Sequence, residues 1–184
     1  MSYEEGLTRQ ITDSSGNTIT YELQAKHGIG RIHSSSDSCG SCPGSSGTTY
    51  ELNDRLRINS STDSLGNITL YTYDNQSNIV TKTEASQTPQ ERTTVYTWHP
   101  VLNLVTSVMR ESISIPGQTD ITNFEYDTHS RLKKILNPDG GVEEMGYDDN
   151  NNLIRKVAAD GNIVSYQYDP LNRVTRVTQL WQGC

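Results

Sequence analysis

Short runs in which apolar and polar residues alternate recur along most of this 184-residue chain. The run Asn162–Tyr168 places Tyr166 and Tyr168 on one face of an extended segment, because successive side chains of a strand point to opposite faces. An Asp-Gly pair at 160–161 precedes this run and supplies the positive φ that a tight hairpin turn needs. The next run, Arg173–Thr178, is predicted to return as the neighbouring antiparallel strand.

These turns and strands repeat along the chain. Three segments share the order Tyr-Asp, three turn-type residues, Asn or Arg, and an aliphatic residue, and their tyrosines are spaced by 21 residues: Tyr126, Tyr147 and Tyr168. Looser copies of the same order begin upstream at Tyr50, Tyr73 and Trp98. A second set of turns falls between the copies and is marked by Gly66, Gly140 and Gly161. Each repeat is therefore predicted to contain two turns and two strands.

Aspartate follows the anchor residue in four of the copies, at Asp74, Asp127, Asp148 and Asp169. A carboxylate at this place can accept backbone N–H bonds in an Asx-turn, and the Asn and Ser residues after it tolerate the left-handed conformation. We therefore predict that these aspartates form turns and do not act in catalysis. The chain has no serine-triad elbow, zinc-protease motif, phosphate-binding loop or dinucleotide fingerprint, so we predict no enzyme activity and no cofactor.

At these residues the chain resembles the Rhs/YD-repeat family, whose unit is Tyr-Asp-x-x-Gly-Arg/Asn-Leu. The resemblance covers residues 45–180 well and residues 1–30 weakly. The chain departs from the pattern where other residues replace the family's glycine: Asp54, Ser77, Leu102, Ser130, Asn151 and Asn172. The resemblance implies a long β-sheet that curves or spirals, as in the hollow shells of bacterial Rhs and insecticidal toxin complex proteins, and as in teneurin-like ectodomains.

The predicted fold class is all-β: an open-ended array of YD repeats in an antiparallel sheet. Residues 1–33 are predicted to be a degenerate N-terminal repeat and residues 34–48 a Ser/Gly-rich insert that carries a Cys-x-x-Cys pair. Residues 49–184 are predicted to be the repeat array, with the whole chain forming a single structural domain.

Composition narrows the partners of such a sheet. Only 32% of the residues are hydrophobic, which favours thin sheets over a thick core. The formal net charge of -7 repels phosphate backbones, so nucleic acid is not expected as a partner. No apolar stretch approaches the roughly 20 residues that cross a bilayer, so membrane insertion is not expected. The start of the chain shows no secretory signal, which fits a mature or truncated chain as well as one that stays inside the cell.

The odd number of cysteines leaves several possibilities open. Cys39 and Cys42 could form a disulfide, remain free thiols, or join His27 and His33 in a tetrahedral zinc site. Cys184 could form a cross-link to the cysteine loop of a neighbouring copy. The alternative is that Cys184 forms no cross-link and the chain simply ends at this residue.

The function predicted from these features is structural. We expect a non-catalytic protein, extracellular or at the cell surface, that assembles with copies of itself into a tube or filament by stacking strand edges. One alternative is a fragment of an Rhs-type hollow shell that encloses a toxin. A second alternative is an adhesion or glycan-binding module with exposed tyrosines, and a third is a metalloprotein centred on the His and Cys residues.

Overall fold

The computed structural model describes residues 7–14, 16, 18–26, 29–38, 47–112 and 117–181. Every regular element in these ranges is a β-strand, and the strands follow one another in the sheet in chain order. Neighbouring strands run antiparallel, so the predicted all-β antiparallel class is confirmed.

The chain divides into two compact units, residues 1–94 and 95–184. The described strands of the first unit are β1 (Leu7–Thr12), β2 (Thr18–Lys26), β3 (Ile29–Ser38), β4 (Thr49–Leu52), β5 (Ile58–Thr62), β6 (Ile68–Tyr73) and β7 (Ile79–Glu84). Strand β3 continues past residue 33, so the first residues of the Ser/Gly-rich segment are extended and pair with β2.

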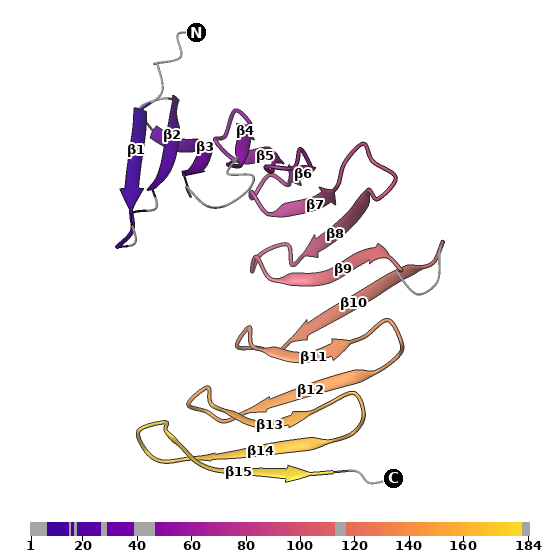
Figure 1. Cartoon of the computed structure of the whole chain (residues 1–184). Helices are drawn as coiled ribbons and strands as arrows, with labels where there is room; N and C mark the ends of the chain where they lie inside the picture. The colour runs from indigo at the N-terminus through magenta and orange to yellow at the C-terminus, as the bar shows by residue number, and fades with distance from the viewer. Residues whose placement is uncertain are drawn as a thin grey trace. The chain divides into compact units, whose positions relative to one another are not determined.

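The boundary between the units falls inside β8 (Arg92–Trp98). The second unit then holds β9 (Val105–Glu111), β10 (Thr119–Tyr126), β11 (Leu132–Leu136), β12 (Val142–Tyr147), β13 (Leu153–Val157), β14 (Ile163–Tyr168) and β15 (Val174–Leu180). Figure 1 shows β9 to β15 side by side in a single layer.

The single layer leaves its side chains only partly covered. Among the described residues no hydrophobic side chain is fully buried, and the buried positions are polar: Ser60, Ser86, Thr94 and Ser112. Aromatic side chains are instead half-buried along the strands, as Phe124 and Tyr126 are in the alternating pattern of β10, where Ile121 is exposed. Ladder hydrogen bonds and contacts between neighbouring strands must therefore supply most of the stability.

A bulge interrupts the ladder at each tyrosine anchor from residue 73 onward. The register shifts immediately before Tyr73, Tyr126, Tyr147 and Tyr168. A bulge adds a residue on one strand and bends it, which re-aims the side chain at that point. The anchors therefore lie where each strand leaves the ladder and enters its turn.

Candidate functional site

The repeat turns are defined here as the turns that follow the anchor residues, and the four that begin with Asp share one backbone geometry. In the turn that begins at Asp148, its N–H donates to the carbonyl of Asn152 at 3.0 Å, and Asn151 N–H donates to the carbonyl of Asp148 at 3.1 Å. Asn151 is left-handed, with φ of 67°. This is a type I turn followed by a left-handed residue, a common three-residue hairpin loop. The turns that begin at Asp74, Asp127 and Asp169 have the same two hydrogen bonds.

The aspartate carboxylate is fully engaged within its own turn. Asp148 Oδ1 accepts the N–H groups of Asn150 at 3.0 Å and Asn152 at 2.8 Å, and Oδ2 accepts the Asn152 amide at 3.0 Å. The hydrogen bond from the Asn152 amide, assisted by the backbone N–H groups, holds the pKa of Asp148 below its ordinary value of 3.8, although burial acts in the opposite direction. These carboxylates are ionised acceptors at neutral pH and suit a turn better than proton transfer.

Arginine replaces asparagine as the fifth residue in two of the four turns that begin with Asp. Arg131 Nε lies 2.7 Å from Asp127 Oδ2, and Arg173 Nε lies 2.7 Å from Asp169 Oδ2. Burial alone would raise the pKa of Asp127, but the hydrogen bonds and charge of Arg131 hold it below the ordinary value.

The anchor tyrosines connect each turn to the preceding strand. The hydroxyl of Tyr147 donates to the carbonyl of Leu132 at 2.9 Å, and the hydroxyl of Tyr168 donates to the carbonyl of Leu153 at 2.8 Å. Tyr73 and Tyr126 bond in the same way to Ile58 and Val105. The strand with the accepting carbonyl pairs with the strand that carries the tyrosine, and their ladder begins two residues after that carbonyl. The tyrosine therefore bridges the strands beyond the end of the ladder.

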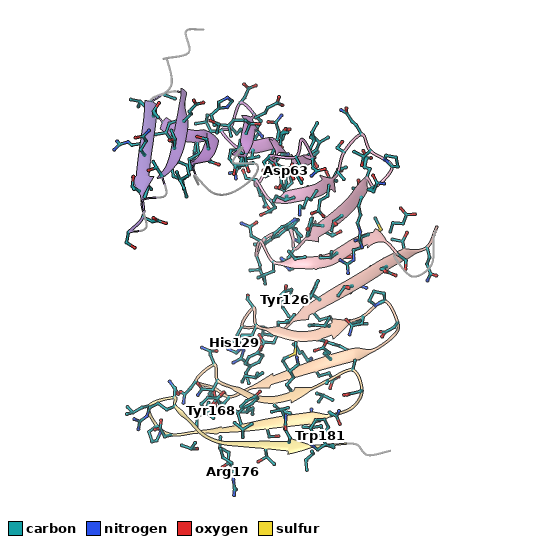
Figure 2. All side chains as sticks on the ribbon, in the orientation of Figure 1. Asp63, Tyr126, His129, Tyr168, Arg176 and Trp181 are labelled. Carbon is teal, nitrogen blue, oxygen red and sulfur yellow. The ribbon has the colours of Figure 1, made fainter. Side chains whose placement is uncertain are left out.

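Side chains also link one repeat turn to the next. Arg131 Nη1 donates to the carbonyl of Asp148 at 2.9 Å and to Asn151 Oδ1 at 3.0 Å, and its guanidinium carbon lies 4.7 Å from the centre of the Tyr147 ring. The Asn152 amide donates to Asn172 Oδ1 in the following turn at 2.8 Å. Figure 2 shows Tyr126, His129 and Tyr168 on the side of the second unit where these turns lie. The turns that begin at Asp127, Asp148 and Asp169 thus form a hydrogen-bonded column in this unit.

The first repeat turn is displaced from the position that the sequence predicted. Asn53 N–H donates to the carbonyl of Arg57 at 2.8 Å, Leu56 is left-handed with φ of 58°, and the bulge falls immediately before Leu52. Leu52 therefore occupies the anchor position that was assigned to Tyr50, and the turn begins two residues later than predicted. Tyr50 lies within β4 opposite Ser61.

The copy at Trp98 has a modified turn. Trp98 ends β8, and His99 Nδ1 accepts the N–H groups of Val101 and Leu102, each at 3.2 Å. An imidazole nitrogen thus takes the role of the carboxylate. The left-handed residue of this turn is Asn103, one place later than in the other copies, because the loop is one residue longer.

The turns between the copies contain left-handed glycines. Gly66, Gly140 and Gly161 have φ of 83°, 85° and 86°. Sequence reasoning overlooked that Asp63 and Asn67 reproduce the repeat turn: Asp63 Oδ1 accepts the Asn67 N–H and Oδ2 accepts the Asn67 amide. The signal was present, because Asp63 precedes the left-handed position by three residues, as the repeat aspartates do.

The predicted disulfide, cross-link and zinc sites fall largely outside the described residues, because that part of the chain contains Cys39, Cys42, Cys184 and His27. His33 is exposed in β3. Within the described ranges no three His, Cys, Asp or Glu residues gather as a metal site would require. The same part of the chain contains no helix long and apolar enough to span a bilayer.

Comparison with known proteins matches part of the chain to a family. Residues 147–180, which include the last two repeat turns, match the RHS Repeat family model. The comparison with curated proteins yields no match.

Solved structures match over most of the chain at low identity. A structure of the Photorhabdus luminescens Tc holotoxin pore with a TccC3 mutation matches 95% of this chain and 11% of that chain, with 15% identity and a TM-score of 0.47. A crystal structure of TcdB2-TccC3 matches 96% of this chain and 13% of that chain, with 12% identity and a TM-score of 0.39. The chain therefore spans only 11% and 13% of the length of these two proteins.

Proposed function

We propose that this chain, in which residues 147–180 are an RHS repeat as the sequence predicted, is a wall segment of the Rhs type that takes part in enclosing a cargo. The observation that carries the proposal is the contact between successive repeat turns. Arg131 binds the carbonyl of Asp148 and covers the ring of Tyr147, so one repeat is completed only when the next repeat is stacked on it. Repeats that bury their side chains against neighbours build extended surfaces.

The exposed edge at β15 supports the same function. Arg173 holds the place that Arg131 holds two repeats earlier, yet its side chain is 73% exposed whereas that of Arg131 is 21% exposed. All residues of β15 are exposed, and Figure 2 shows Arg176 projecting from this edge. The occupant that fits beside β15 is a strand of a further RHS repeat, whose anchor tyrosine would lie under Arg173 and donate to the carbonyl of Val174.

The wall segment is proposed to enclose a polypeptide cargo. The resemblance to shells that enclose toxins suggests a toxin polypeptide inside a wall much longer than this chain, at an extracellular or cell-surface location. Enclosure is testable on a whole protein that contains this chain, because a protease should spare the enclosed polypeptide until urea opens the wall. Cleavage of that polypeptide at the same rate with the wall intact would contradict enclosure.

The stacking role is tested by a matched pair of variants. Arg131→Gln and Arg173→Gln each remove one aspartate ion pair, but only Arg131→Gln also removes contacts with the following repeat. We expect Arg131→Gln to lower the free energy of unfolding by about 2 kcal/mol more than Arg173→Gln, since hydrogen bonds to charged groups and cation–π contacts are each worth roughly 1–3 kcal/mol when partly desolvated. Equal losses in urea unfolding would mean that the turn column does not hold the repeats together.

A second candidate is the self-assembling tube or filament predicted from the sequence. The exposed edge strands β1 and β15 favour it, because an open strand edge can pair with another copy. Sedimentation velocity and negative-stain electron microscopy over a range of concentrations separate the two functions. A wall segment gives particles of constant size, whereas a self-assembling chain gives fibres that lengthen with concentration and shorten when Val177→Lys places a charge on the β15 edge.

A further inference from the structure

One arginine of the repeat turns has no carboxylate partner. Arg57 is the fifth residue of its turn, the place where Arg131 and Arg173 each bind an aspartate Oδ2 at 2.7 Å. The turn of Arg57 begins with Asn53, whose Oδ1 accepts the Arg55 N–H at 2.9 Å and the Arg57 N–H at 3.1 Å. Asparagine thus preserves the backbone turn but removes the negative charge that the other turns give to their arginine.

The consequence is a buried guanidinium Nε–H without its anion. Arg57 Nε is inaccessible to solvent and has no hydrogen-bond partner among the described residues. The guanidinium carbon lies 5.8 Å from the centre of the Tyr73 ring, which covers one side of it. A buried donor without a partner costs free energy, and a charged donor costs more than a neutral one. An anion that reached Nε would remove this cost.

Arg57 lines a cavity within the first unit that is large enough for such an anion. The cavity has a volume of about 400 Å³, and its lining includes Asn53, Arg55, Tyr71, Tyr73 and Ser77. Small-molecule sites typically have volumes of roughly 300–1,000 Å³ and combine aromatic walls with a few polar groups. Two tyrosines supply the aromatic wall here, and the other lining residues are polar or charged.

The charges that line the cavity favour an anion with a single charge. Two arginines are balanced there by Asp54 and Asp74. Burial opposes ionisation of Asp74, but the hydrogen bonds from Asn78 hold its pKa below the ordinary value, so it is ionised at neutral pH. A dianion would meet two fixed carboxylates, whereas a monoanion on Arg57 meets less repulsion.

We propose that this cavity binds a carboxylate, which takes the place at Arg57 Nε that the Asp127 carboxylate holds at Arg131. The carboxylate comes from a free small acid or from an acidic side chain of a polypeptide, and both sources share this chemistry. The site is independent of the wall function, because it uses the cavity beside Arg57 and not the β15 edge.

The probe is acetate, added to the whole chain while the Nε–H signal of Arg57 is followed by nuclear magnetic resonance. We expect a saturable shift of this signal at millimolar acetate, since a lone carboxylate gains few contacts. Chloride at matched ionic strength should leave the signal in place, and inorganic phosphate should bind about tenfold more weakly than acetate because of its second charge. N-acetylaspartate amide, the second probe, reports whether a peptide-borne carboxylate also enters. An Arg57 signal that does not move with either carboxylate overturns the proposal.

The decisive variant is Asn53→Asp, which supplies the missing carboxylate from the chain itself. We expect this variant to bind acetate at least tenfold more weakly and to melt at a higher temperature than the parent chain. Asn150→Asp places the same change on an exposed position of another repeat turn and should leave acetate binding unchanged. Acetate binding to Asn53→Asp as tight as to the parent chain would refute a site at Arg57 Nε, without bearing on the wall function.

Discussion

Replacing Tyr168 with phenylalanine tests the anchor at the level of one hydroxyl. The hydroxyl donates to the carbonyl of Leu153 at 2.8 Å, and the ladder between the two strands begins only at the pair Arg155 and Ser165. The change keeps the aromatic ring and removes the donor. The carbonyl of Leu153 must then accept a hydrogen bond from water, and the half-buried ring limits the access of water to it.

The expected magnitude follows from the exchange of one hydrogen bond. A neutral intramolecular hydrogen bond contributes about 0.5–1.5 kcal/mol net, and a carbonyl left partly without water costs at the upper end of that range. We therefore expect Tyr168→Phe to lower the free energy of unfolding by about 1 kcal/mol. For a chain of this length, such a loss lowers the melting temperature by roughly 2–4 °C.

The matched control lies two residues away on the same strand. No hydrogen bond of the Tyr166 hydroxyl is found among the described residues, and its ring is also half-buried. Urea unfolding followed by circular dichroism should show a lower midpoint for Tyr168→Phe, with an unchanged slope, and a midpoint close to the parent value for Tyr166→Phe. Midpoints that fall equally in both variants would refute the anchor role of the hydroxyl and leave only the packing of the ring.

Further predictions concern the turns and the titration of their groups. Ser130→Gly should raise the free energy of unfolding by up to about 1 kcal/mol, and with it the melting temperature, because Ser130 is exposed with φ of 63°. Thr128→Gly in the same turn should lower the melting temperature. The pKa of Asp148 is lower in the folded chain, so the contribution of its carboxylate to the free energy of unfolding is complete above pH 3.8 and is lost as the pH falls below that value. Urea unfolding midpoints measured from pH 7 to pH 2 should show this loss, and Asp148→Asn should reduce it. Burial raises the pKa of Tyr126, so its hydroxyl should ionise only above 10.0, later than exposed tyrosines in an ultraviolet titration, and its stabilising hydrogen bond should be lost as the pH rises through that raised value.

Most of the repeat turns could be located from the sequence because their determinants are local. An aspartate that binds N–H groups two and four residues ahead needs only the right neighbours, and Asn151 and Asn172 tolerate the left-handed place. The first repeat turn was misplaced because its left-handed residue is not one that local rules would select. Leu56 adopts φ of 58°, which a bulky side chain disfavours, so no local rule pointed to it.

The sequence by itself determined the strand class, the period and the residues that form most turns, because alternation and turn propensity act over a few neighbouring residues. Only the tertiary structure decided which groups meet across repeats. Arg131 reaches Asp148 and Tyr147, and the ring of Tyr73 covers one side of Arg57. Both sets of contacts depend on the stacking of strands distant in sequence. Such contacts follow from the register and bulges of the sheet, which place a side chain beside the next turn; the spacing of residues along the chain does not specify them.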